Sequence, residues 1–352
     1  MTIRNVLICT TQVPFTRGGA ESHVEGLRKA LVEAGYDAEV AALPFKWYPP
    51  EEIMRGALAW RLLDVSEANG KPIDLVVGMK FPAYVVAHQR KVLWVMHQYR
   101  AAYNLAGTAF DDLSHYPEGP RVREWIRECD ARFIGEARKV FANSKTVAER
   151  LMRYNGIESE PLYHPPPRAD RLRRGEQGDY VFYPSRLEAQ KRQEILIEAM
   201  AHTRTPVRAV LAGGTRDARH YESLVRQHKV GGRVELRGFV SEDEMVELYA
   251  NALGVCYLPF DEDYGYVTLE GMLSAKPVVV ARDGGGATEF VEHESEGFVV
   301  EPDPRALAAA LDALYTDRAR ARRMGERARE KLLAADLSWQ TVVERIINAA
   351  EK

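Results

Sequence analysis

The sequence contains little cysteine and no long apolar run. Only three of its 352 residues are cysteines, and Cys9, Cys129 and Cys256 lack the spacing of metal or redox sites. We therefore expect buried, reduced thiols in a cytoplasmic protein. No stretch approaches the ~20 apolar residues of a membrane-spanning helix. The first residues, MTIRNVLICTT, resemble a short strand and not a signal peptide.

An excess of charge of one sign is also absent. The 48 Lys and Arg residues nearly balance the 51 Asp and Glu residues, which leaves a net charge of −3. This balance gives no argument for bulk nucleic-acid binding. A hydrophobic content of 46% and a charged content of 28% are typical of a globular protein. The length suits two domains of ordinary size.

Short apolar runs alternate with amphipathic helical patterns along the chain. The expected strands are 6–9, 36–42, 73–77, 92–96, 140–142, 180–183, 207–212, 233–236, 255–258 and 278–281. The expected helices are 20–34, 44–72, 120–139, 145–154, 191–201, 242–251, one that opens at Gly265, one from 306 onwards and a last amphipathic one from 338. This alternation predicts an α/β fold in which helices cover parallel sheets.

One proline-rich stretch separates two such series. Residues 161–179, PLYHPPPRADRLRRGEQGD, contain four of the eighteen prolines and show no periodicity. Such a stretch is typical of a linker. We therefore place a first domain at 1–170 and a second domain at 171–337.

The second domain contains the most informative stretch, residues 254–286. A buried strand, 255–258, leads into a loop with three acids, and Gly265 then opens a helix that contains Glu270. Ligands of open α/β sheets bind at this carboxyl end of the strands. The first amides of a helix suit a phosphate, and a glycine lets a ligand approach the backbone closely.

The carboxylates of Glu262 and Glu270 would repel a phosphate, so a role on the hydroxyl groups of a ribose or hexose fits them better. The alternative is a solvated loop followed by an acid that merely favours the start of its helix. Short motifs alone do not decide between these interpretations.

Two features of the first domain point to the same kind of site. Gly18 and Gly19 follow the first strand and precede a helix, where their amides could face a ligand. The alternative is a flexible loop, and the pattern is not the G-x-G-x-x-G of dinucleotide folds. His97 follows a buried strand, so it could face the same ligand site as the glycine loop. The alternative interpretation is a histidine with only a structural, hydrogen-bonded role.

The expected helix at 120–139 has an apolar side and several arginines. A basic amphipathic helix can lie on anionic lipid, which would give a weak peripheral membrane contact through the first domain. Packing on the sheet is the favoured alternative, because a strand at 140–142 follows at once.

Six segments in order resemble the family 4 glycosyltransferases over nearly the whole chain. They are RGGAESHVEGLRKAL, FANSKTVAERL, YPSRLEAQKRQEILIEAM, LAGG with RGFVSEDEMVELYANA, the pair of glutamates eight positions apart at Glu262 and Glu270, and the turn from Gly285 to Glu289. One departure is clear. The family usually has Glu-Gly-Phe-Gly where this chain has Glu262-Asp263-Tyr264-Gly265, so a charged residue enters the expected sugar pocket.

The resemblance implies a GT-B fold, in which two Rossmann-like domains face each other across a cleft. It also implies that the helix at 338–352 packs back on the first domain. The first domain would bind the acceptor, and the second would bind the nucleotide sugar.

The resemblance further implies roles for individual residues. Arg186 and Lys191 would neutralise the leaving phosphate, Glu262 would bind the sugar and Glu270 the ribose. His97 would lie near the sugar and the acceptor. The remaining donor-binding residues would be Gly18, Gly19, Gly238, Phe239, Val240, Tyr264, Gly265, Tyr266 and Val267.

The implied function is retaining transfer of a hexose-type sugar from a UDP- or GDP-linked donor to a glycan, a lipid-linked glycan or a small molecule. No metal and no further cofactor are expected, since fixed cations replace the metal. The rival interpretations are a GT-B-like nucleotide-sugar epimerase or hydrolase, a nicotinamide dehydrogenase and an exported solute-binding protein. The missing G-x-G-x-x-G motif and the missing signal-peptide layout argue against the last two.

Overall fold

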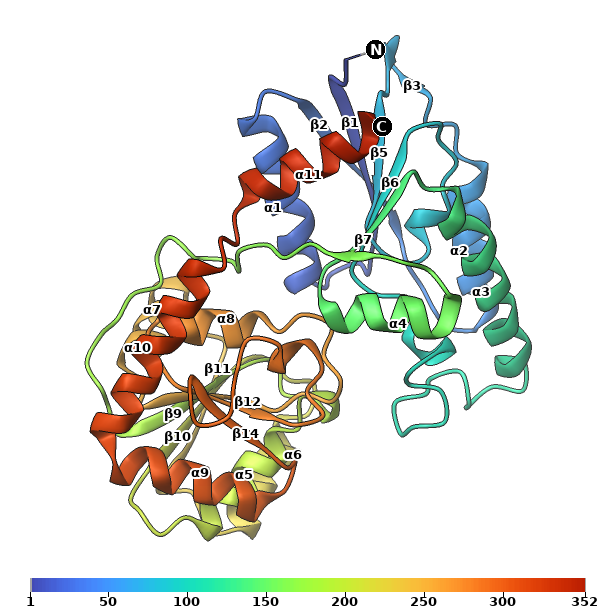
Figure 1. Ribbon diagram of the computed structural model, residues 1–352. Helices are drawn as coiled ribbons and strands as arrows, with labels where there is room; N and C mark the ends of the chain where they lie inside the picture. The colour runs from blue at the N-terminus through green and yellow to red at the C-terminus, as the bar shows by residue number, and fades with distance from the viewer. Residues whose placement is uncertain (1, 352) are drawn as a thin grey trace. The chain divides into compact units, whose positions relative to one another are not determined.

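The computed structural model describes residues 2–351, which form two compact units. Unit 1 contains the residues up to His164 together with those from Ser338 onwards, and unit 2 is Pro165–Leu337. Each unit has a six-stranded parallel sheet with helices on its faces (Figure 1). The predicted α/β fold with two Rossmann-like domains is therefore confirmed.

The sheet of unit 1 has the strand order β2-β1-β5-β6-β7-β8. Its strands are β1 (Asn5–Gln12), β2 (Asp37–Pro44), β5 (Leu75–Gly78), β6 (Lys91–Val95), β7 (Lys139–Ala142) and β8 (Glu160–Pro161). The helices of unit 1 are α1 (Gly19–Glu33), α2 (Glu51–Leu62), α3 (Gly119–Phe133), α4 (Lys145–Asn155) and α11 (Trp339–Glu351).

Alternation along the strands divides the core of unit 1 into two layers. Val6 and Ile8 of β1 pack in one layer with α1 and α11, whereas Cys9 packs in the other with α2, α3 and α4. Successive side chains of a strand point to opposite faces, so a sheet covered on both faces needs nearly continuous apolar strands. Cys9, Cys129 and Cys256 are all buried free thiols, as predicted.

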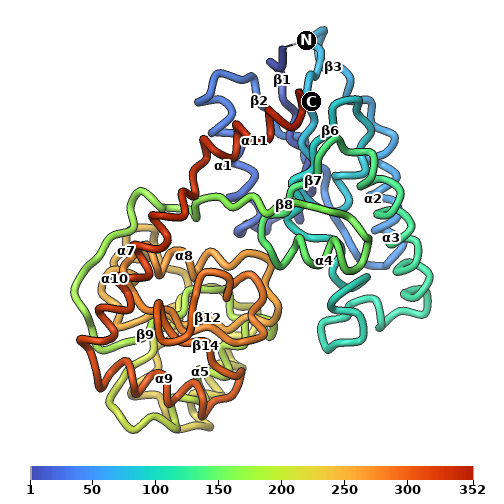
Figure 2. The backbone as a smooth tube through the Cα atoms, in the orientation of Figure 1, coloured from blue at the N-terminus to red at the C-terminus, as the bar shows by residue number. Residues whose placement is uncertain are grey.

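The end of the described chain lies against its beginning within unit 1. In Figure 2 the red helix α11 runs beside the blue helix α1. Val342, Val343, Ile346 and Ile347 of α11 are buried against the sheet layer that α1 also covers. Trp339 at the start of α11 lies directly over Gly26 of α1, where any side chain would overlap the indole ring.

Unit 2 has the strand order β11-β10-β9-β12-β13-β14, all parallel. Its strands are β9 (Tyr180–Pro184), β10 (Arg208–Ala212), β11 (Val234–Gly238), β12 (Gly254–Tyr257), β13 (Val278–Ala281) and β14 (Gly297–Val300). Its helices are α5 (Gln193–His202), α6 (Ala218–Gln227), α7 (Glu242–Asn251), α8 (Tyr266–Leu273), α9 (Pro304–Thr316) and α10 (Arg318–Ala334).

The predicted helix at 44–72 is wrong over most of its length. Only α2, Glu51–Leu62, is helical there, and a small antiparallel hairpin of β3 (Glu67–Ala68) and β4 (Lys71–Pro72) follows. Asn69 and Gly70 form its turn with positive φ at both residues. Asn-Gly is the preferred pair for such a turn, so the local signal was present and outweighed the apparent helical periodicity.

Other helix boundaries also differ from the prediction. α3 ends at Phe133, short of the predicted 139. The helical region after residue 304 is two helices, because Asp303 caps α9 and Asp317 caps α10 through bonds from backbone amides. The helix α6 and the strand β14 were not predicted. Among residues 2–351, no helix is long and apolar enough to cross a membrane.

The contact between Trp339 and Gly26 makes a prediction for stability. Gly26→Ala should lower the free energy of unfolding by about 1–3 kcal/mol, because the added methyl overlaps the indole and forces α11 to shift. The measurement is chemical denaturation of the full chain.

Gly56→Ala is the matched control, since it also lies inside a helix and its added Cβ would meet only Pro82 at 3.8 Å. Replacing a helical glycine without a clash should stabilise by up to about 1 kcal/mol. Equal stabilisation by both changes would show that α11 does not depend on the contact of Trp339 with α1.

Candidate functional site

The strand order of unit 2 reverses between β9 and β12. The chain moves outward from β9 in one direction through β10 and β11, and in the other through β12, β13 and β14. Such a reversal is where open α/β sheets bind ligands. Arg186 and Lys191 follow β9, and Glu262 follows β12, so three of the residues expected in the site come from these two neighbouring strands.

Lys191 and Glu262 form an ion pair that includes a tyrosine. The Lys191 ammonium contacts Glu262 Oε2, and it also lies 3.3 Å from the Tyr257 hydroxyl. That hydroxyl donates to the same Glu262 oxygen over 2.8 Å. The Lys191 and Glu262 side chains are only 15% and 19% exposed. The structure thus brings together two residues that lie 71 positions apart in the chain.

The protonation of Glu262 follows from these contacts. Burial works to raise the pKa of its carboxyl group, but the charge of Lys191 and hydrogen bonds from Lys191 and Tyr257 hold that pKa below its ordinary value. Glu262 is therefore a carboxylate at neutral pH. Within the described chain, its Oε1 takes a long contact of 3.4 Å from the Asp263 amide.

Arg192 fixes the geometry around this pair. It lies in the left-handed region with φ 54°, and its guanidinium donates to the Asp283 carboxylate over 2.9 and 2.7 Å. It also donates to the carbonyls of Leu258 and Pro259 at 2.7 and 2.8 Å. One side chain thus joins the segment after β9 to those after β12 and β13, next to Lys191 in the chain.

A glycine turn supports the acidic loop from the other side. The amide of Glu262 donates to Gly284 over 3.1 Å, and the amide of Gly286 donates back to the Glu262 carbonyl over 2.8 Å. A Cβ at Gly285 would lie 2.5 Å from the Glu262 carbonyl oxygen. Gly265, with φ 82°, precedes α8 and packs against Ala287. These positions need glycine because backbone approaches backbone there.

Glu270 lies in a separate, buried network. Its Oε1 accepts from Arg168 over 2.7 Å and its Oε2 from the Tyr249 hydroxyl over 2.6 Å. Arg168 also contacts Glu242 over 3.0 Å. Burial raises the pKa of Glu270 above its ordinary value, and Arg168 and Tyr249 oppose that rise. Each oxygen of Glu270 already accepts one bond and retains a second lone pair.

The other expected donor-binding residues of unit 2 surround this edge of the sheet. The Arg186 side chain is 57% exposed and lies 3.5 Å from Glu188. Gly238 ends β11 with φ 64°, and the Phe239 ring is largely exposed and covers Gly214. Val240 is half-buried. Tyr264 is buried, and its ring contacts the ring of Tyr266 edge to face. Tyr266 and Val267 are the first two residues of α8.

The expected residues of unit 1 lie at the carboxyl edge of its own sheet. Gly18 and Gly19 are exposed at the start of α1, but the Gly18 amide donates to Glu21 over 2.7 Å. Lys80, just after β5, lies 3.7 Å from the same carboxylate and is 12% exposed. Burial lowers the pKa of Lys80, and Glu21 opposes that shift.

His97 follows β6 in unit 1. Its Nδ1 lies 2.8 Å from the carbonyl oxygen of Gln98. A carbonyl oxygen only accepts, so this contact needs a proton on Nδ1 and leaves Nε2 as the basic nitrogen of the neutral ring.

Two arginines of α3 have structural partners. Arg123 donates to the Ala101 carbonyl over 3.1 Å and to Asp111 over 2.6 Å. Arg127 donates to the Ala102 carbonyl over 2.9 Å. Both therefore fix the segment that follows His97. In the described part of the chain, no group of three or more His, Cys, Asp or Glu residues could hold a metal ion.

Comparison with known proteins agrees with this architecture. Residues 17–167 match the sequence profile of Glycosyltransferase Family 4, and residues 169–331 match that of Glycosyl transferases group 1. The D-inositol 3-phosphate glycosyltransferase of Corynebacterium glutamicum is 26% identical over 97% of this chain and 90% of its own length. That of Corynebacterium diphtheriae is 31% identical, but the match covers 47% of this chain and 40% of the relative.

Solved structures show the same fold at low sequence identity. HepE from Anabaena, determined with UDP and glucose, is 20% identical and superposes with a TM-score of 0.72 over 99% of this chain and all of its own. Sucrose-phosphate synthase from Thermosynechococcus elongatus, also 20% identical, gives 0.75 over 97% of each chain. The chain belongs to the family 4 glycosyltransferases, and its resemblance to them in sequence is thereby confirmed.

Several residues of these sites were not singled out from the sequence. Tyr257 has the appearance of one more apolar strand residue, and Arg168 lies in a linker without periodicity. Arg168 meets Glu270, 102 positions away, only after distant segments come together. Tyr257 lies five positions before Glu262, but it meets Lys191 only when the segments after β9 and β12 are adjacent.

The sequence held one signal for Arg192 and Asp283. Arg192 directly follows Lys191, and the oppositely charged Asp283 lies two residues after the expected strand 278–281.

The Arg192 contacts generate a second prediction. Asp283→Ala should destabilise unit 2 by about 1–3 kcal/mol, since it leaves a largely buried guanidinium without its carboxylate. It should also reduce turnover, because the Lys191 and Glu262 segments lose a shared anchor. Denaturation and steady-state kinetics measure the two effects.

Glu301→Ala is the matched control, because it removes the exposed ion pair with Arg282, the residue next to Asp283. An exposed pair is worth about 0–1 kcal/mol, so little change is expected. If both variants behaved alike, Arg192 would not be the anchor of this loop.

Proposed function

We propose that this glycosyltransferase moves a hexose-type sugar from a UDP- or GDP-linked donor to an acceptor hydroxyl, with retention of anomeric configuration. The observation that carries the proposal is the Lys191–Glu262–Tyr257 cluster at the reversal of strand order in unit 2. An ammonium beside an ionised carboxylate can serve both ends of a sugar phosphate. The cation faces the phosphate, and the carboxylate accepts bonds from the sugar hydroxyls.

In the proposed reaction the bond between the anomeric carbon and the phosphate oxygen breaks, and negative charge develops on the departing diphosphate. Groups placed where that charge develops lower the barrier. Lys191 has three N–H donors, and its contacts among the described residues are Glu262 and Tyr257. One donor therefore remains for a phosphate oxygen. Arg186 supplies a second cation from an exposed side chain.

The acceptor hydroxyl forms its new bond on the face that the phosphate leaves, and its proton passes to the departing phosphate oxygen. This route retains configuration and needs no protein nucleophile. Glu262 would instead bind the sugar, and Glu270 the ribose of the nucleotide. His97 and the Gly18-Gly19 loop, in unit 1, would contribute to the sugar and acceptor side.

The relatives suggest which donors and acceptors to test first. HepE has been determined with UDP and UDP-glucose, and relatives over the greater part of this chain are D-inositol 3-phosphate glycosyltransferases. UDP-sugars are thus the first donors to test, with GDP-sugars as the comparison. We propose that Gly238, Phe239 and Val240 contact the base, and that no metal is needed because two side-chain cations serve the phosphate.

The acceptor is proposed to be a glycan, a lipid-linked glycan or a small hydroxyl compound, used in the cytoplasm. For a lipid-linked acceptor, exposed arginines on α3, such as Arg121, would give weak contact with an anionic membrane.

The dependence of the reaction on an added acceptor tests the proposed function. Sugar transfer should require an added acceptor from a panel that includes an inositol phosphate. Isomerised donor without acceptor would instead show an epimerase.

The division of labour between the two glutamates is a third prediction. Glu270→Gln should weaken binding of the free nucleoside diphosphate, because a neutral amide is a poorer acceptor for ribose hydroxyls. Glu262→Gln should leave that binding intact and weaken only the sugar-linked donor. Calorimetric titration with UDP and UDP-glucose, and with the GDP pair, measures both.

Each glutamine keeps the shape of its glutamate, so folding should survive and circular dichroism checks it. Glu289→Gln, a change of the same kind after the glycine turn, is the control. Equal losses for both ligands in both glutamate variants would show that the two roles are not separate.

A further inference from the structure

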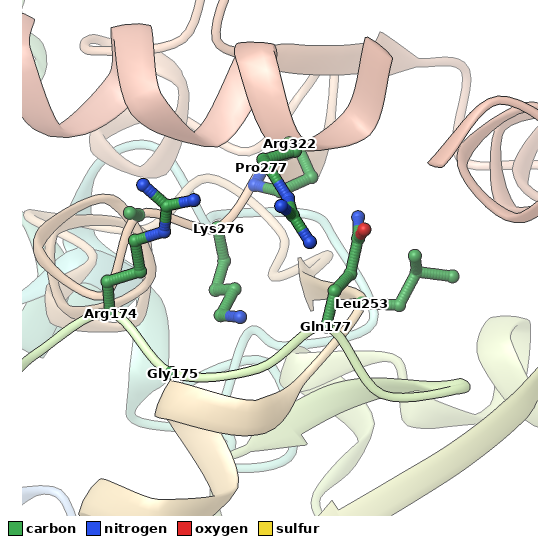
Figure 3. A pocket seen from close by; sticks show the side chains of 8 residues that line it. Arg174, Gly175, Gln177, Leu253, Lys276, Pro277 and Arg322 are labelled. Carbon is green, nitrogen blue, oxygen red and sulfur yellow. The ribbon is translucent and has the colours of Figure 1, made fainter. Parts of the chain in front are cut away.

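A small basic pocket lies at the opposite edge of the unit 2 sheet, where the strands begin. Leu253 directly precedes β12, and Pro277 directly precedes β13, so both lie at the edge where the strands begin. Lys191 and Glu262 lie at the opposite, carboxyl edge of the sheet. Figure 3 shows the pocket from close by. It is lined by Arg174, Gly175, Gln177, Leu253, Ala275, Lys276, Pro277 and Arg322.

Lys276 is the unusual member of this set. It is 3% exposed, and its ammonium donates to the Glu176 carbonyl over 3.0 Å. Among residues 2–351, no carboxylate lies within 4 Å of that ammonium, the distance of an ion pair. Buried charges in proteins are normally paired, so an ammonium with one neutral acceptor is incompletely compensated.

Two arginines add to this positive charge. Arg322 projects from α10 towards the pocket in Figure 3 and has no hydrogen-bond or ion-pair partner in the described part of the chain. Arg174, from the segment before β9, lies 2.9 Å from Glu326. Arg174 is 52% exposed and Arg322 is also exposed, so water solvates both guanidinium groups, and Lys276 is the buried member of the three cations. Burial lowers the pKa of Lys276 to about 8, and the charges of Arg174 and Arg322 add to that shift.

The backbone holds these cations close together. Gly325 lets α10 approach the turn between α8 and β13, because a Cβ there would overlap the Ala275 carbonyl. Gly175 lets its own segment approach the Ala250 carbonyl, where a Cβ would lie 2.6 Å away. Gln177 binds the Arg318 carbonyl over 3.1 Å. These segments are therefore held by close backbone approaches and one side-chain hydrogen bond, none of which involves the three cations.

We propose that this pocket binds a tetrahedral oxyanion, either inorganic phosphate or the phosphate group of a small phosphomonoester. A guanidinium presents paired N–H donors that match phosphate oxygens, and an ammonium adds a compact charge. The lining includes no aromatic ring, so nothing in it would stack on a nucleotide base. The bound anion would join the linker segment, the turn before β13 and α10.

The test is calorimetric titration of the full chain with inorganic phosphate at constant ionic strength. Arg322→Gln should weaken binding at least tenfold, because it removes a cation with no other partner. Arg323→Gln is the matched control, since Arg323 is the next residue of α10, is exposed as Arg322 is, and does not line the pocket. Equal affinities in the two variants would overturn the proposal, as would an absence of binding in the wild type.

Phosphate could also enter the proposed donor site, and a third variant separates the two. Arg186→Gln should leave phosphate binding at the basic pocket unchanged. Binding that Arg186→Gln abolishes and Arg322→Gln spares would assign the anion to the donor site and refute this proposal, without refuting the proposed function. Lys276→Met, with its folding checked by circular dichroism, should also abolish binding.

The source of the anion is decided by a parallel titration with glycerol phosphate. If glycerol phosphate bound more tightly than inorganic phosphate, and Arg322→Gln abolished that binding, the pocket would be assigned to a phosphomonoester. Tighter binding of inorganic phosphate would assign it to the free ion. In either case saturation should raise the melting temperature of the wild type and Arg323→Gln but not of Arg322→Gln, because only folded protein offers the site.

Discussion

The ion pair of Lys191 and Glu262 is the interaction on which the candidate site depends. A buried cation and a buried carboxylate each lose hydration, so neither is stable there alone. Together, and with the Tyr257 hydroxyl, they keep two opposite charges at one edge of the sheet. In the proposed function, the carboxylate would bind the sugar and the ammonium would bind its phosphate. The pair lies at the carboxyl edge of the sheet, where the strand order reverses.

Contacts that do not involve the two paired side chains keep the pair in place. Arg192 ties the loops after β9, β12 and β13 to one another, and the Gly284–Gly286 turn binds the backbone of the acidic loop. Rigid support of this kind matters because a site displaced by about 1 Å loses much of its effect on rate. Glu270 has separate support from Arg168 and Tyr249, which is consistent with a distinct role for each glutamate.

Much of the fold follows from the sequence, because buried strands and amphipathic helices have strong periodic signals. The prediction was wrong at 44–72, where an Asn69-Gly70 turn outweighed helical periodicity, and it missed the capped break at Asp317. Three residues of the candidate site were predictable as well, because Glu262, Glu270 and Lys191 lie near the ends of strands or the starts of helices. Their partners were not. Arg168 meets Glu270, and Tyr257 meets Lys191, only when distant segments come together. The same holds for Asp283 and Arg192. The basic pocket around Lys276 has the same origin.

The central claim is that fixed cations, chiefly Lys191, stabilise the leaving diphosphate without a metal. The most direct measurement is the turnover of a nucleotide-sugar donor in the presence of a strong chelator, for the wild type and for Lys191→Met. We predict undiminished turnover of the wild type and a loss of about 10²–10³ in kcat for the variant, the effect of removing one donor to a developing charge. Loss of wild-type turnover on chelation, restored by Mg²⁺ or Mn²⁺, would contradict the account.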